Sequence, residues 1–111
     1  MTPAQQLEQI ISQIPYNTSN PHWLAENRVL LAGLYSYFSG QLEKLIFSKP
    51  AKWLELRKEC KSDNATTKMW QMTEDGQKEE IYELRMKKID KLMSSMNSMI
   101  RVLENEARNI S

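Results

Sequence analysis

Apolar residues recur along the chain at the three- and four-residue spacing of amphipathic helices. The first such stripe consists of Leu7, Ile10, Ile11 and Ile14. It is preceded by Thr2, Pro3 and Gln5, the pattern of a capping box with proline at the first helical position. This pattern predicts a short helix over about residues 3–14, which Pro15 ends.

A second, more apolar stretch begins after a polar loop. Asn20 can cap a helix that has Pro21 at its first position, and a break is expected where Lys49 precedes Pro50. The pattern predicts a core helix over about residues 21–48, whose apolar side chains surround much of its circumference. A strip of small residues, Gly33, Ser36 and Gly40, indicates that another helix packs closely there, although two tolerated glycines would give the same pattern.

The second half of the chain predicts three further helices. Two shorter ones are expected over about residues 50–61 and 64–72, with Ser62 or Asp63 as the cap of the latter. At Thr73 the signals conflict, because Glu74 and Asp75 are typical of a helix start whereas Asp75 followed by Gly76 is typical of a turn. We expect a brief break there and a long helix over about residues 77–108.

The long helix carries an apolar seam with four- and three-residue spacing. The seam residues are Ile89, Leu92, Met96, Met99 and Leu103. Such spacing resembles a coiled-coil heptad, and a helix longer than its companions cannot be covered by them completely. The seam is therefore expected to bind a partner, most simply a second copy of the chain in a dimer.

These elements predict an all-α fold, a small helical bundle with a long C-terminal helix, in one domain over residues 1–111. Apolar residues make up 41% of the chain and charged residues 26%, as in ordinary folded proteins. The sequence has no signal-peptide pattern and no apolar run of about 20 residues, so we expect no membrane association. A single cysteine, Cys60, excludes an internal disulfide and favours a cytoplasmic location.

Charge is distributed in blocks although the net charge is only +1. Segments 44–68 and 85–101 are basic, and residues 73–84 are acidic. The basic side chains that would hold nucleic-acid phosphates are Lys52, Arg57, Lys58, Lys61, Arg85, Lys87, Lys88 and Lys91. In the alternative that we favour, the blocks pair with each other, as Glu83 and Lys87 would at helical spacing.

Residue types that carry chemistry are scarce. The three glycines are isolated, so no phosphate-binding loop is expected, and His22 and Cys60 are the only histidine and cysteine. We expect no metal, no cofactor and no catalysis.

The C-terminal half resembles short helical proteins encoded by bacteriophages, which have no assigned role and often occur among replication and recombination genes. The resemblance rests on Trp70, Thr73, Gly76, Lys88, Leu103, Glu104 and Arg108 in that order. It implies a phage accessory protein in the host cytoplasm. The apolar seam adds the expectation that this protein acts by self-assembly and by binding a host or phage protein. The alternatives are a nucleic-acid-binding module and an inhibitor of a host defence nuclease.

Overall fold

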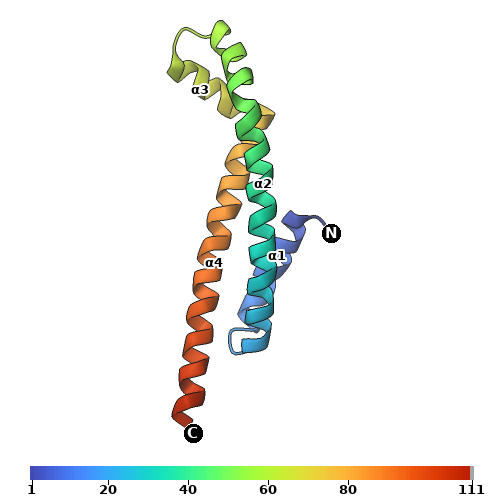
Figure 1. Ribbon diagram of the computed structural model, residues 1–111, viewed down its shortest axis with the longest axis vertical. Coiled ribbons are helices and arrows are strands. Elements are labelled where there is room, and N and C mark those ends of the chain that lie inside the picture. Colours follow the sequence, from blue (N-terminus) through green and yellow to red (C-terminus); the bar gives the residue numbers. More distant parts are fainter. Residues whose placement is uncertain (111) are drawn as a thin grey trace. The chain divides into compact units, whose positions relative to one another are not determined.

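The computed structural model describes residues 1–110, and over this range all regular secondary structure is helical (Figure 1). The helices are α1 (Pro3–Gln13), α2 (Pro21–Glu59), α3 (Asp63–Met72) and α4 (Glu74–Ile110), and a turn of 3-10 helix (Ile14–Tyr16) follows α1. The all-α fold with a long C-terminal helix is confirmed. None of the described helices combines the length and apolar character of a membrane span.

The residues group into two compact units, a finer division than the single domain expected from the length. The first unit contains residues 1–37 and the described residues from Lys87 onward. The second unit contains Phe38–Met86. Helices α2 and α4 each contribute to both units, and each unit is described by itself below.

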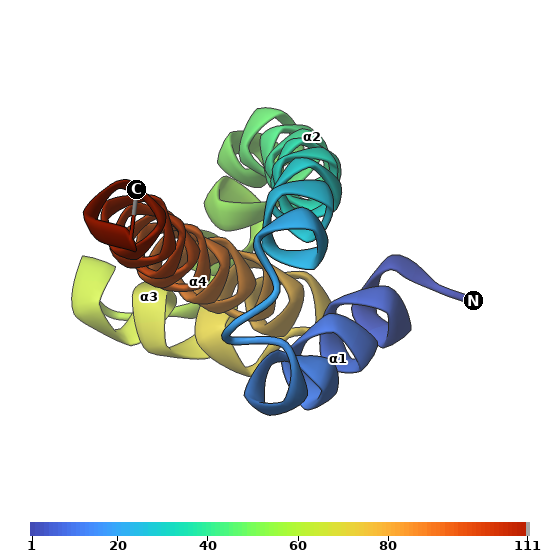
Figure 2. The same cartoon turned by 90° about the horizontal axis from the view of Figure 1, so that it is seen from below.

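The first unit consists of α1, the first part of α2 and the last part of α4. Figure 2 shows these helices from below. The core of the unit is made of aliphatic side chains from all three helices: Leu7, Ile10, Leu24, Leu31, Leu34, Ile89 and Met96. Polar contacts join the same helices, because Arg28 donates to the Asn97 Oδ1 at 2.6 Å and the Lys88 ammonium lies 3.9 Å from the Glu8 carboxylate. The three helices therefore form one small core.

Two helix starts in this unit follow the sequence signals. The Thr2 Oγ1 accepts a hydrogen bond from the Gln5 backbone N–H, and the Gln5 side chain accepts one from the Thr2 N–H, which completes the capping box. The Asn20 side chain accepts from the Trp23 N–H at 3.1 Å, as expected of a residue that caps α2. These local hydrogen bonds define the residues at which α1 and α2 begin.

The second unit consists of the last part of α2, helix α3 and the first part of α4. Its centre is Trp70, which is only 4% exposed and donates from Nε1 to the Glu79 Oε2 at 2.9 Å. Lys49 donates to the other oxygen of Glu79 at 3.0 Å, and its ammonium lies 5.4 Å from the centroid of a Trp70 ring. Phe38 is also buried, and its ring lies 6.1 Å from that of Tyr82. One tryptophan therefore ties α3 to both α2 and α4.

The break predicted at Pro50 is wrong, because α2 continues through this residue to Glu59. A proline inside a helix costs about 3 kcal/mol, since it lacks an N–H and crowds the preceding turn. Leu45, Lys49, Trp53 and Leu56 are at least half-buried on both sides of the proline, while Pro50 itself is exposed. We attribute the continuity to this packing, which keeps both segments in one helix.

The start of α4 resolves the conflict at residues 73–76. Helix α4 begins at Glu74, three residues earlier than predicted, and the break is confined to Thr73. The Thr73 Oγ1 accepts from the Gly76 N–H at 3.0 Å and donates to the Trp70 carbonyl at 2.6 Å. A Cβ on Gly76 would lie 1.8 Å from that carbonyl oxygen, so the glycine is required by close packing. It does not form the turn suggested by its sequence context, since no described glycine has a positive φ.

Candidate binding surfaces

The seam on α4 is partly covered by the chain itself. Ile89 and Met96 are completely buried in the core of the first unit, and Leu92, Met99 and Leu103 are half-buried. This burial corrects the expectation that the whole seam serves a second copy. The five residues share one face as predicted, and the chain uses the most buried of them as its own core.

The strip of small residues does not pack against another helix of this chain. A Cβ added at Gly33 or Gly40 would meet no atom within 4 Å. Gly33 and Ser36 are exposed, and Gly40 is half-buried. The expected close packing at these three positions is therefore wrong within residues 1–110.

Several basic side chains proposed for phosphate binding pair with carboxylates of the second unit. Lys52 forms an ion pair with Asp75, and the Lys58 ammonium lies 3.1 Å from the Glu55 carboxylate. The guanidinium of Arg57 lies 2.8 Å from the Asp63 carboxylate and also donates to the Cys60 carbonyl. The Lys52–Asp75 contact joins a basic segment to the acidic segment, as the paired-charge interpretation expects, whereas Glu55 and Asp63 belong to the basic segment itself. All three contacts reduce the charge that phosphates would meet.

The remaining basic candidates are divided between the units. In the second unit, the Arg85 guanidinium lies 5.4 Å from the centroid of the Phe38 ring, and Lys61 is exposed. In the first unit, Lys88 approaches Glu8, while Lys87 and Lys91 are exposed. Within the described part of the chain, no ion pair involves Lys61, Lys87 or Lys91.

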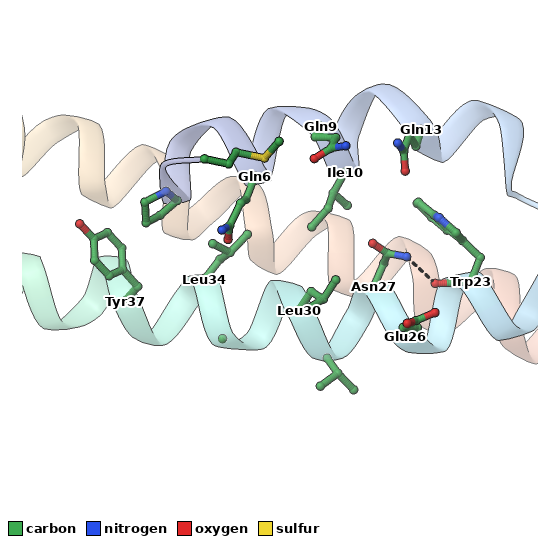
Figure 3. A pocket seen from close by; sticks show the side chains of 14 residues that line it. Gln6, Gln9, Ile10, Gln13, Trp23, Glu26, Asn27, Leu30, Leu34 and Tyr37 are labelled. Carbon is green, nitrogen blue, oxygen red and sulfur yellow. Dashed lines mark hydrogen bonds between the residues drawn. The ribbon is translucent and has the colours of Figure 1, made fainter.

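A groove of about 810 Å³ lies between α1 and α2 in the first unit (Figure 3). The amide side chains of Gln6, Gln9 and Gln13 on α1 line one side of it, and Leu30 and Tyr37 of α2 line the other. Asn27 is buried at its floor and donates to the Trp23 carbonyl at 2.9 Å. The groove offers hydrogen-bonding groups on one wall and exposed apolar surface on the other.

The second unit exposes an apolar surface that the sequence analysis did not single out. Its residues are Ile46, Phe47, Pro50, Trp53 and Leu54 of α2, referred to below as the α2 apolar face. Phe47 is 77% exposed, Leu54 59% and Ile46 51%, whereas Trp53 is half-buried. The break predicted at Pro50 hid this face, because it assigned its residues to two different helices. The spacing of Phe47, Pro50 and Leu54 by three and four residues is the signal that finds the face in one continuous helix.

The single cysteine and the single histidine belong to different units. Cys60 is half-buried in the second unit with its Sγ 3.8 Å from the Sδ of Met69, and His22 is exposed in the first unit near Glu26. Over residues 1–110 no three His, Cys, Asp or Glu side chains are grouped so as to hold a metal ion. In an exposed pair at the start of α4, Glu74 raises the pKa of Lys78.

Comparison with known proteins gives no relative for this chain. No family model, no curated protein and no solved structure matches it.

Proposed function

We propose that this chain is a non-catalytic binding protein that contacts another protein chain through the α2 apolar face. The face belongs to one helix of one compact unit, so a partner can dock on it without any rearrangement of the core. This proposal keeps the protein-binding role expected from the sequence but moves the contact from the α4 seam to α2.

The exposure of Phe47, Leu54 and Ile46 on one face of α2 is the observation that carries the proposal. Single exposed apolar residues are common on protein surfaces, whereas contiguous large ones mark interaction sites. Aromatic residues are also enriched in the cores of protein interfaces. A phenylalanine that is 77% exposed on the same helix face as an exposed leucine and isoleucine is therefore suited to anchor a partner.

The alternative of nucleic-acid binding receives less support from the geometry. Trp70, which lies between the two basic segments in the sequence, does not offer a stacking platform for bases, because it is only 4% exposed and its indole N–H already donates to Glu79. Lys52, Arg57 and Lys58 are paired with carboxylates. The basic segments thus offer fewer free cations than their composition indicates.

The resemblance to phage-encoded helical proteins supplies the cellular setting of the proposal. An accessory protein of a phage would meet its partners in an infected bacterium, and inhibition of a host defence nuclease would be one way to act there. The α2 apolar face is equally suited to a host protein and to a phage protein, so an infected bacterium is where partners should be sought.

Photo-crosslinking from the face tests the proposal. A photoreactive amino acid replaces Phe47 in the full chain, and the control replaces Met72, which is 79% exposed in the same unit but lies outside the face. We expect adducts that contain protein, either this chain or another one, from position 47 and not from position 72. Adducts with nucleic acid alone, or equal labelling at both positions, would overturn the proposal.

Titration with oligonucleotides distinguishes protein binding from nucleic-acid binding. We expect no gain in mass by light scattering when single-stranded or duplex oligonucleotide is added at about 150 mM salt, where phosphate contacts are already weakened. Binding that persists at this salt concentration and disappears at higher salt would favour the nucleic-acid alternative instead.

A further inference from the structure

We propose that the α2 apolar face binds the same face of a second copy of this chain, with the two helices antiparallel. This inference rests on the proposed function and names the partner of the same site. The evidence for it is the order of residues along α2. Residues at equal distances on either side of a point between Pro50 and Ala51 complement each other.

Along α2, apolar residues lie at matching positions on the two sides of Pro50 and Ala51, and the charged residues beyond them have opposite signs. Moving outward from Pro50 and Ala51, the exposed side of α2 presents Phe47 in one direction and Leu54 in the other. Four residues farther out in each direction, the exposed positions are Glu43 and Lys58, with the exposed Lys44 next to Glu43. An acidic residue therefore ends the stripe on one side and a basic residue ends it on the other.

A two-fold axis beside Pro50 and Ala51 exploits this order. In a symmetric dimer each contact occurs twice, because the same patch is used by both copies. With antiparallel helices, Phe47 of one copy faces Leu54 of the other, and Glu43 faces Lys58. The small side chains of Pro50 and Ala51 lie at the crossing point, where helix axes approach to about 8–10 Å.

Charge decides between the antiparallel and the parallel arrangement. A parallel pair in register would place Glu43 against Glu43 and Lys58 against Lys58, and like charges across an interface oppose association. The antiparallel pair replaces both repulsions with attractions.

The existing partner of Lys58 does not prevent this contact. Lys58 and Glu55 lie 3.1 Å apart, but their side chains are 72% and 74% exposed. An exposed pair of this kind contributes little, so the flexible lysine is able to reach Glu43 of the second copy.

The size of the face sets the expected strength of the dimer. Stable interfaces bury about 800 Å² on each partner, and five side chains of one helix supply less than that. We therefore expect a weak dimer that forms at about 10 µM to 1 mM, the range of transient associations.

Sedimentation equilibrium of the full chain from about 10 µM to 1 mM tests whether a second copy binds the α2 apolar face. Phe47→Asp should weaken the dimer by at least tenfold, because it removes the most exposed large apolar side chain of the face and buries a charge. The matched control is Val29→Asp, since Val29 is 69% exposed in the first unit and lies outside the face. The control should leave dimerisation within about twofold of the unmodified chain. Circular dichroism of both variants verifies that the helices persist.

A charge exchange tests the orientation. Glu43→Lys and Lys58→Glu should each weaken the dimer by about tenfold, since each creates two like-charge contacts in place of two attractive ones. The double variant E43K/K58E restores both attractions and should return to within about threefold of the unmodified chain. In a parallel dimer, neither single substitution would weaken association.

The outcomes separate this inference from the function on which it rests. A chain that stays monomeric at every concentration, yet gives adducts with a different protein from position 47, would refute the second copy as occupant and leave the binding function intact. A dimer unaffected by Phe47→Asp, or one that the single charge substitutions leave unchanged, would refute the proposed arrangement. A dimer weakened by Phe47→Asp and restored by the double exchange supports it.

Discussion

Gly76 and Gly33 show how differently two helical glycines can be used. Gly76 is buried at the start of α4, with the carbonyl of Trp70 where a side chain would be. Gly33 is exposed on α2 and has no atom near the position of a Cβ. Spacing along the chain marked Gly33 as the close-packed residue, and only the tertiary contacts reveal that Gly76 has this role.

The two glycines are expected to respond to alanine with opposite signs. Gly76→Ala should lower the free energy of unfolding by about 1–3 kcal/mol, because the new methyl group overlaps the Trp70 carbonyl. Gly33→Ala should raise it by about 0.5–1 kcal/mol through helix propensity. Urea denaturation followed by circular dichroism measures both. A neutral or stabilising Gly76→Ala would contradict the packing described here.

Glu79 is the polar residue on which the centre of the second unit depends. It accepts hydrogen bonds from the indole of Trp70 and from the ammonium of Lys49. Its neighbour Glu80 is exposed and forms no ion pair among residues 1–110, so it serves as a control in the same turn of helix.

Glu79→Ala is expected to destabilise the protein by about 1–3 kcal/mol, since a buried indole N–H loses its acceptor. Glu80→Ala should change the free energy of unfolding by less than about 0.5 kcal/mol. Thermal denaturation and the fluorescence of the tryptophans report both changes. Equal effects of the two substitutions would mean that the Trp70 contact contributes nothing specific.

At the scale of elements, α2 shows which features local sequence signals predict and which they do not. The caps at Thr2, Asn20 and Ser62 lie where short-range patterns place them, because each depends on a hydrogen bond only three residues away. The break predicted at Pro50 failed because the side chains that hold the helix together there make tertiary contacts. A single sequence does not show which partners those side chains find.

Pro50→Ala should stabilise the protein, since alanine restores an N–H that can donate to the carbonyl one turn earlier. We expect the free energy of unfolding to rise by about 1–3 kcal/mol, a large part of the usual cost of an internal proline. Pro21→Ala is the matched control. Proline is favourable at the first position of a helix, so this change should not stabilise. Chemical denaturation measures both, and a loss of stability in Pro50→Ala would show that the proline is required where it stands.

At the scale of the whole molecule, the sequence was sufficient to predict a helical protein but not how its apolar stripes are used. Leu7 and Ile10, Leu24 and Leu31, and Ile89 and Met96 all lie on predicted apolar faces, and all are buried. Their burial against one another within a chain, rather than between two chains, follows from the arrangement of three helices. The α2 apolar face was missed for the converse reason, because its exposure is visible only when the covered side of α2 is known.

A substitution at Met96 tests whether the α4 seam is buried within one chain or between two chains. Met96→Asp places a charge at a completely buried position and should unfold much of the first unit, with a loss of helical signal in circular dichroism. Ser95→Asp, at the exposed neighbouring position, should leave that signal unchanged. If Met96→Asp instead kept the helices folded and converted a dimer into a monomer, the seam would be an interface between copies.

The close packing of Trp70, Thr73 and Gly76 between the end of α3 and the start of α4, called the α3–α4 corner, has a consequence for the order of folding. Its contacts join residues at most nine positions apart, so forming them closes only short loops and sacrifices little chain entropy. The contact of Glu8 with Lys88, in contrast, joins distant parts of the chain. Because folding rates rise when contacts are local, we expect α3 and the start of α4 to assemble early and to serve as a nucleus. The glycine that permits close packing at this corner would then influence how fast the second unit forms as well as how stable it is.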